Sequence, residues 1–175
     1  MLTTTEGEAT PILIVRDAWL LDLGRKPYRE VWELQKALVD RRAEDKIPDG
    51  LILVEHDPVA TLGRRGTREG PERGVWVGGK KIASIGLAVH RNVTFHGFAL
   101  NVTTDLREFL KIRPCGHDGG IMTSMEKSLG HPVDLEDVKA SVIAHFQAVF
   151  GVTFRRVNLS ELLPELPSGH RSRRP

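Results

Sequence analysis

The stretch GVWVGGKKIASIGLAVHRNVTFHGFALNV, residues 74 to 102, sets the fold of this chain. Two bulky runs flank Gly78 and Gly79, and adjacent glycines can adopt the positive φ that a two-residue hairpin turn requires. A third run, which starts at Val93, predicts another strand. It contains Gly97, and a glycine inside a strand often marks close approach of a neighbour or ligand. We therefore expect a β-hairpin followed by a further strand.

Upstream of this stretch, residues 11–21 and 51–56 predict strands, because both segments are bulky and largely apolar. A helix is expected at residues 28–46, since apolar residues recur there at helical spacing with charges opposite. Its expected buried face consists of Tyr28, Val31, Trp32, Leu34, Leu38 and Val39.

Downstream, residues 105–112 predict a short helical or turn element, and residues 122–130 a short helix. Thr123 or Ser124 would cap that short helix and Gly130 would end it. A longer helix is expected at residues 134–151, with Leu135, Val138, Val142, Phe146 and Phe150 on one face. The elements together predict an α/β (α+β) fold in which helices pack on mixed sheets.

The length of 175 residues fits one domain, for which we expect the bounds 11–160. Residues 1–10 are polar and are expected to form a mobile leader. The segment 161–175, rich in Pro, Ser and Arg, is expected to be a disordered tail.

Composition excludes several classes of protein. The net charge is only +2, and base-reading motifs are absent, so no nucleic-acid partner is expected. No run approaches the roughly 20 apolar residues that cross a bilayer, and no secretory signal is apparent. We therefore expect a cytoplasmic protein that does not contact membranes.

Cys115, the only cysteine, lies in the turn-like run RPCGHDGG. Pro114 donates no backbone hydrogen bond, and the glycines after Cys115 allow tight turns whose N–H groups can converge on one point. A nucleophile and an oxyanion site can be built together in this way. Composition alone favours a different interpretation, in which Cys115 is a small buried hydrophobe.

Lys81 is the second candidate for catalysis. Strand alternation places Lys81 on the face of Ala83, Ile85, Leu87 and Val89, whereas Lys80 shares a face with Ser84 and Gly86. A desolvated lysine can act as a general base or acid near neutral pH. The alternative is a pair of exposed lysines beside a turn.

Three histidines could also contribute. His56 ends a strand, His96 lies within one, and either could face a pocket or form ordinary interior hydrogen bonds. His117 follows Cys115 by two residues, but we rank it below Lys81 as the partner of the thiol. One cysteine and scattered histidines provide no metal-ligand spacing, so no metal is expected.

Four blocks together resemble the octanoyltransferase family, LipB: LGRKPYREVWELQ, LILVEHDPVATLGRRG, the stretch 74–102 and IRPCGHDGGIMTS. They occur in the family's order, from about Trp19 to Phe150. The resemblance implies the fold of biotin and lipoate protein ligase catalytic domains. It also implies transfer of an octanoyl group from octanoyl-acyl carrier protein to a lysine of lipoyl domains, in 2-oxoacid dehydrogenases and the glycine cleavage H protein, without a cofactor.

The resemblance assigns roles to particular residues. Cys115 matches the catalytic cysteine and Lys81 the catalytic lysine. Four further residues match positions that line the acyl site: His56, Gly86, His96 and Gly97. An acidic carrier protein would suit the basic run GRRGTREGPER.

One long family segment has no counterpart near residues 67–70, so we expect an incomplete fold with exposed sheet edges and self-association. Two alternatives therefore stay open. The chain could be an inactive remnant that binds acyl carrier protein or lipoyl domains, or an ATP-dependent ligase related to lipoate and biotin ligases.

Overall fold

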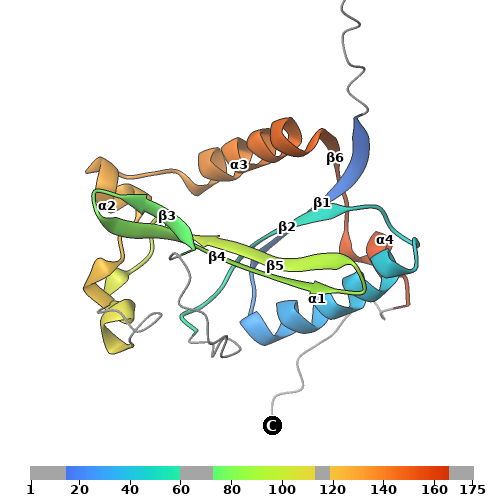
Figure 1. Cartoon of the computed structure of the whole chain (residues 1–175), viewed down its shortest axis with the longest axis horizontal. Coiled ribbons are helices and arrows are strands. Elements are labelled where there is room, and N and C mark those ends of the chain that lie inside the picture. Colours follow the sequence, from blue (N-terminus) through green and yellow to red (C-terminus); the bar gives the residue numbers. More distant parts are fainter. Residues whose placement is uncertain (1–14, 60–72, 113–118, 166–175) are drawn as a thin grey trace, which may run out of the picture.

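The computed structural model describes residues 15–59, 73–112 and 119–165. They form two three-stranded sheets with helices on either side (Figure 1). One sheet is parallel and the other antiparallel. The expected mixed α/β fold is confirmed.

The parallel sheet has the order β2-β1-β6, so the first strand along the chain is the central one. The strands are β1 (Arg16–Arg25), β2 (Gly50–Glu55) and β6 (Val152–Arg156). Four consecutive residues of β1 are buried, from Ala18 to Leu21. Such continuous burial means that both faces of the strand are covered.

Helices cover the two faces of β1. On one face, Trp19 and Leu21 pack with Leu38 of α1 (Tyr28–Ala43) and Leu162 of α4 (Leu159–Leu162). The same core cluster is completed by Ile47, Val157 and Leu163. On the other face, Asp22 forms an ion pair with α3 (Leu135–Phe150). Figure 1 shows α3 and α1 on opposite sides of the strands.

The antiparallel sheet has the order β3-β4-β5 and comes from the stretch 74–102. Its strands are β3 (Gly74–Val77), β4 (Lys80–His90) and β5 (Val93–Leu100). Gly78 and Gly79 have φ values of 54° and 73°, which confirms the expected hairpin turn. Arg91 and Asn92 also have positive φ and form a second two-residue turn, which the sequence analysis did not identify.

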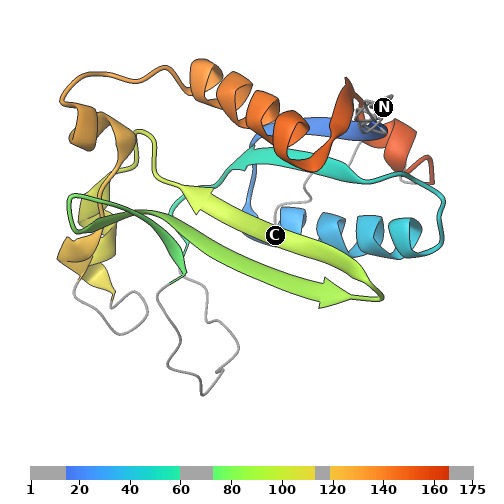
Figure 2. The ribbon, with the colours of Figure 1, turned by 45° about the horizontal axis from the view of Figure 1, so that its top comes forward.

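Figure 2 shows β4 and β5 as a long hairpin that extends past the parallel sheet toward α2 (Met125–Leu129). At its turn, Arg91 forms ion pairs with Asp40 and Glu44 at the end of α1. At the opposite end, the hairpin meets two 3-10 elements, η1 (Leu106–Lys111) and η3 (Gly119–Ile121). The hairpin therefore joins α1 to the segments that flank the region of Cys115.

The helix boundaries follow local capping chemistry. Ser124, rather than Thr123, caps α2, because its side chain accepts a hydrogen bond from the Lys127 N–H. Gly130 ends α2 in the left-handed conformation, as expected. Helix α1 ends at Ala43, three residues before the expected end, and Asp45 then turns the chain with a φ of 54°.

One expectation about packing was wrong. Trp32 was expected on the buried face of α1, but it is 38% exposed and stacks against Lys36 instead. Helix α3 forms as expected, but none of its residues is buried, and Phe150 is 56% exposed. Periodicity identifies an apolar face but not whether a partner exists to cover it.

The end of the domain also differs from the expected boundary at residue 160. Leu162 and Leu163 are buried in the core beside Trp19, so the folded part includes them. Residues 1–14 and 166–175, which contain the leader and most of the tail, lie outside the described residues. Within the described ranges, no helix combines the length and the apolar character needed to cross a bilayer.

Candidate active site

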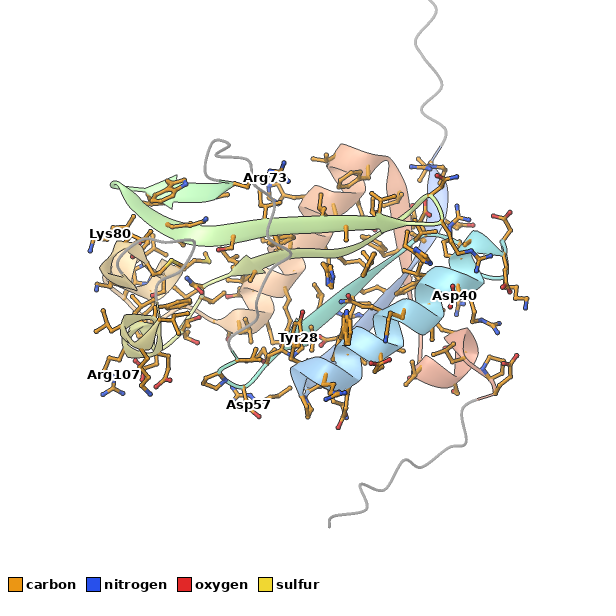
Figure 3. The ribbon with its side chains drawn as sticks, turned by 60° about the horizontal axis from the view of Figure 1, so that its bottom comes forward. Tyr28, Asp40, Asp57, Arg73, Lys80 and Arg107 are labelled. Carbon is orange, nitrogen blue, oxygen red and sulfur yellow. The ribbon has the colours of Figure 1, made fainter. Side chains whose placement is uncertain are left out.

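The turn at Gly78 and Gly79 places two neighbouring lysines in different environments. Lys81 is 6% exposed, whereas Lys80 is exposed at the end of the sheet, where Figure 3 labels it. The alternation of the strand therefore buries the lysine that the sequence analysis selected. The side chain of Lys81 lies beside Trp76 of β3, with Nζ 5.6 Å from the centroid of the indole ring.

The apolar face that was expected around Lys81 is only partly buried. Ala83 is 3% exposed, but Ile85, Leu87 and Val89 are 42%, 60% and 67% exposed. Ile82, on the alternate face, is buried because a β-bulge shifts the register between Val75 and Trp76. Lys81 is thus at the covered end of a strand whose remaining length is open.

The segment that follows the region of Cys115 runs along β4. The Lys80 Nζ donates a hydrogen bond to the Gly120 carbonyl at 3.2 Å. Met122 forms a parallel bridge with Lys81, and the Thr123 N–H donates to the Lys81 carbonyl at 2.9 Å. The chain therefore returns to Lys80 and Lys81 within a few residues of Cys115.

Buried polar residues of the described ranges gather at this place: Lys81, Asn101, Thr123 and Ser124. Asn101 links the segments, because its Nδ2 donates to the Thr123 carbonyl at 3.0 Å and its own N–H donates to the Ile82 carbonyl at 2.9 Å. The Asn101 carbonyl in turn accepts a hydrogen bond from the Met125 N–H. We call these four residues the polar cluster.

The sequence analysis missed Asn101. The available signal was an amide side chain at the end of an apolar strand, where a polar group must find hydrogen-bond partners. Cys115, Pro114 and His117 lie outside the described residues, so the structure does not locate the expected nucleophile.

Three residues of the expected acyl site come together on β4 and β5. Gly86 pairs with Gly97, and Leu87 pairs with His96 in the next position. A Cβ atom at either glycine would meet nothing within 4 Å among the described residues, so there is open space beside the backbone at both positions. His96 has a φ of 67° and Gly97 a φ of 127°, a change of conformation that leaves the His96 side chain exposed.

His56 belongs to the other sheet. It follows β2, its Nδ1 lies 2.7 Å from the Lys26 carbonyl, and its ring is 5.4 Å from that of Tyr28 in an edge-on arrangement. Figure 3 shows Tyr28 and Asp57 close together, away from the end of the sheet that holds Lys80. In the described part of the chain, no hydrogen bond or ring contact joins His56 to Lys81 or His96.

A shallow apolar groove of about 350 Å³ lies beside the polar cluster. Leu100 and Met125 form one wall, and Val138 and Val142 of α3 form the other. Leu100 precedes Asn101 and pairs with Ala83, so the groove lies close to the buried end of β4. No group of three His, Cys, Asp or Glu side chains in residues 15–59, 73–112 and 119–165 could hold a metal ion.

Lys81 is thus a buried lysine on the middle strand of a sheet, next to a segment that backbone hydrogen bonds tie to it. Comparison with known proteins gives the class of the fold. Residues 65–147 match the lipoyl protein ligase A/B catalytic domain. That domain defines the class of this fold.

Curated proteins of one kind match most of the chain. The octanoyltransferase of Syntrophobacter fumaroxidans is 31% identical over 222 aligned positions, which cover 85% of this chain and 97% of that protein. The octanoyltransferase of Syntrophotalea carbinolica is 34% identical and covers 73% of this chain and 92% of that protein. The octanoyltransferase of Desulforamulus reducens is 49% identical over 100 residues, 57% of this chain and 41% of that protein.

The chain belongs to the octanoyltransferase family. The first alignment extends over 222 positions, more than the 175 residues of this chain, so that relative carries residues at many positions where this chain has none. This difference in length agrees with the expected gap, which itself stays a prediction. Its place near residues 67–70 stays a prediction, because those residues lie outside the described ranges.

Proposed function

We propose that this chain transfers an octanoyl group from octanoyl-acyl carrier protein to a lysine of a lipoyl domain through a thioester on Cys115. The observation that carries the proposal is the burial of Lys81 at 6% exposure, together with the hydrogen bond from Thr123 to its backbone. A lysine is seldom buried without a function or a paired charge. Among the described residues, no ion pair includes Lys81.

The first half-reaction follows from the chemistry of a thiol. The Cys115 thiolate attacks the carbonyl carbon of the octanoyl thioester, and a new carbon–sulfur bond forms. The bond to the sulfur of the carrier protein then breaks, and that sulfur leaves as a thiol after it takes up a proton. Lys81, as the neighbouring acid and base, supplies this proton.

The second half-reaction restores the enzyme. The ε-amine of the acceptor lysine attacks the carbonyl carbon of the Cys115 thioester, an amide forms, and the carbon–sulfur bond to Cys115 breaks. The nitrogen loses a proton, which Lys81 accepts and passes on. In this scheme no metal, nucleotide or redox cofactor takes part, and the reaction takes place in the cytoplasm.

In this proposal the acyl chain binds over the backbone around Gly86 and Gly97, where neither residue has a side chain, and His96 lies at the edge of this site. Support comes from the pairing of the two glycines and from the open space beside both. The role proposed for His56 rests on its match to the family alone, since its side chain contacts Lys26 and Tyr28 on the other sheet. Exposed Lys80 would face an acidic carrier protein.

A second candidate function is that of an inactive remnant that still binds acyl carrier protein or lipoyl domains. The observation in its favour is the open sheet face, where Leu87, Val89 and Phe98 are 60%, 67% and 45% exposed. An acyl pocket needs walls that exclude water, and among the described residues the stacking of Phe146 of α3 on Phe98 covers only part of this face.

The test is the intact mass of the protein after incubation with octanoyl-acyl carrier protein, compared between the chain and its Cys115→Ala variant. We expect an octanoyl adduct that hydroxylamine removes and that the variant does not form. Absence of an adduct from folded protein would favour the remnant. Full transfer activity in Cys115→Ala would contradict the thioester mechanism and favour an ATP-dependent ligase, which needs no nucleophilic cysteine.

A further inference from the structure

We propose that Trp76 is the positioning residue for Lys81, and that its indole ring fixes where the lysine ammonium lies. This inference rests on the proposed function, in which Lys81 moves protons. Nothing in the family match assigns a role to Trp76, so the argument depends on the geometry of β3 and β4.

The register of the hairpin brings the two side chains together. Trp76 is the direct partner of Lys81 in the antiparallel pair, and the bulge beside it breaks the ordinary alternation. Side chains that face each other across a strand pair lie about 4.5 to 5.5 Å apart at Cβ. The Nζ of Lys81 reaches to 5.6 Å from the centre of the indole ring, within the range of a cation–π contact.

Gly74 lies tightly against β4. A Cβ atom at this position would lie 2.3 Å from the Ala83 carbonyl oxygen and 2.5 Å from the Lys81 Cε. Gly74 does not have a positive φ, so its own backbone conformation does not require glycine. The requirement is for space, first against the backbone of Ala83 and also beside the side chain of Lys81.

Among the described residues, Lys81 has no ion-pair partner. Its neighbours there include Trp76 from β3 and, from the segment after η3, Met122 and Thr123, and none of these three carries a carboxylate. A buried ammonium without a paired charge is costly, and the negative face of an indole ring offsets part of that cost. The contact with Trp76 therefore holds the ammonium in place.

The experiment compares Trp76→Leu, which removes the aromatic face, with Trp76→Phe, which keeps one. Each protein is labelled with acetic anhydride across a pH series, and the modification of Lys81 and Lys80 is followed by peptide mass. Lys80, exposed in the same molecule, is the internal control. Thermal unfolding of both variants checks that the fold is kept.

We expect the pH midpoint of Lys81 labelling to fall by about 0.5 to 1.5 pH units in Trp76→Leu, because loss of the ring disfavours the charged form. Trp76→Phe should restore most of this shift, and the midpoint of Lys80 should not move. If Trp76 were only a packing residue, its loss would admit water and raise the midpoint of Lys81. A rise or no change would therefore overturn the proposal.

Activity supplies a second measurement. Trp76→Leu should slow transfer from the acyl-enzyme on the order of tenfold while the KM for octanoyl-acyl carrier protein stays unchanged. A change confined to KM would contradict a role in placing the proton-transfer group. The labelling measurement needs no turnover, so it tests the contact even if the chain proves to be an inactive remnant.

Should Trp76→Leu fail to fold, Trp76→Phe carries the same test, with a smaller fall of the Lys81 midpoint expected. An unchanged midpoint in a folded Trp76→Phe protein would then count against the proposal. The two proposals can thus fail separately, since the thioester assay addresses Cys115 and the labelling addresses Trp76 and Lys81.

Discussion

The two sheets of this chain differ in what covers them. In the parallel sheet, Trp19 and Leu21 are packed by α1 and α4 and are 7% and 4% exposed. In the antiparallel sheet, Leu87 and Val89 are 60% and 67% exposed, although their side chains are apolar too. The contrast shows that the described segments cover one sheet and leave much of the other sheet exposed.

The covered part of the antiparallel sheet is its end at Lys81. There the segment 121–125 closes over β4, and Asn101 ties β5 to the same segment. Away from this end, α3 touches the sheet mainly through the stacking of Phe146 on Phe98. We therefore expect substitutions in the parallel sheet to affect stability most, and substitutions at the covered end of the antiparallel sheet to affect activity.

The largest effect is expected at Lys81. Lys81→Ala should slow octanoyl transfer by about 10²- to 10⁴-fold, because it removes the group that moves protons. Lys80→Ala is the matched control and should have a mild effect, since Lys80 is exposed and donates a hydrogen bond to the Gly120 carbonyl. Transfer rates from octanoyl-acyl carrier protein measure both. The reverse ranking would show that the assignment by strand face is wrong.

The next effect concerns stability. Trp19→Ala should lower the free energy of unfolding by about 3 to 5 kcal/mol, because the ring fills the core and its Nε1 donates to the Pro48 carbonyl. Leu87→Ala, in the open sheet, should cost less than about 1 kcal/mol. Urea unfolding measures the two. Equal losses would mean that Leu87 is covered in solution, for example by a second copy of the chain.

A smaller, pH-dependent effect is expected at Asp22, which fastens β1 to α3 through Lys139 at 3.1 Å. Burial raises the pKa of Asp22, but hydrogen bonds from the Gly24 N–H and Lys139 outweigh it, and the pKa is lowered from 3.8. The lowered pKa of Asp22 means that this stabilisation is present above about pH 4 and is lost as the pH falls through the folded-state pKa.

Asp22→Asn should therefore cost about 1 to 2 kcal/mol at pH 7, and the difference from the unmodified chain should shrink below pH 4. Urea unfolding at a series of pH values checks this. Glu136→Gln removes the other, more exposed partner of Lys139 and should cost less. A pH-independent loss in Asp22→Asn would indicate a packing defect instead of a lost ion pair.

Local chemistry made much of the fold predictable. The glycine pair at 78–79, the cap at Ser124 and the stop at Gly130 each require a particular backbone conformation, and the structure contains all three. Lys81 is buried and Lys80 is exposed, as expected, although Ile82 and Ala83 are buried as well, so simple alternation does not account for this end of the strand. These features depend on neighbours within a few residues, so the sequence contains them directly.

Features that depend on distant segments were not predictable in this way. The exposure of Leu87, Trp32 and Phe150 depends on whether another segment covers them, which no periodicity reveals. Asn101 gained its role from hydrogen bonds to residues near 82 and 123. The roles of Cys115 and Lys81 came from the resemblance to a family, and those two roles stay predictions.

The order of strands in the parallel sheet has a consequence for synthesis of the chain. β1 is made before β2 and β6, yet it lies between them, and β6 is the last of the described strands to be made. Pairing over such a separation is slow and comes late in folding. Trp19 and its apolar neighbours therefore stay without one of their two strand partners until β6 has been made, a period in which chaperones would recognise them.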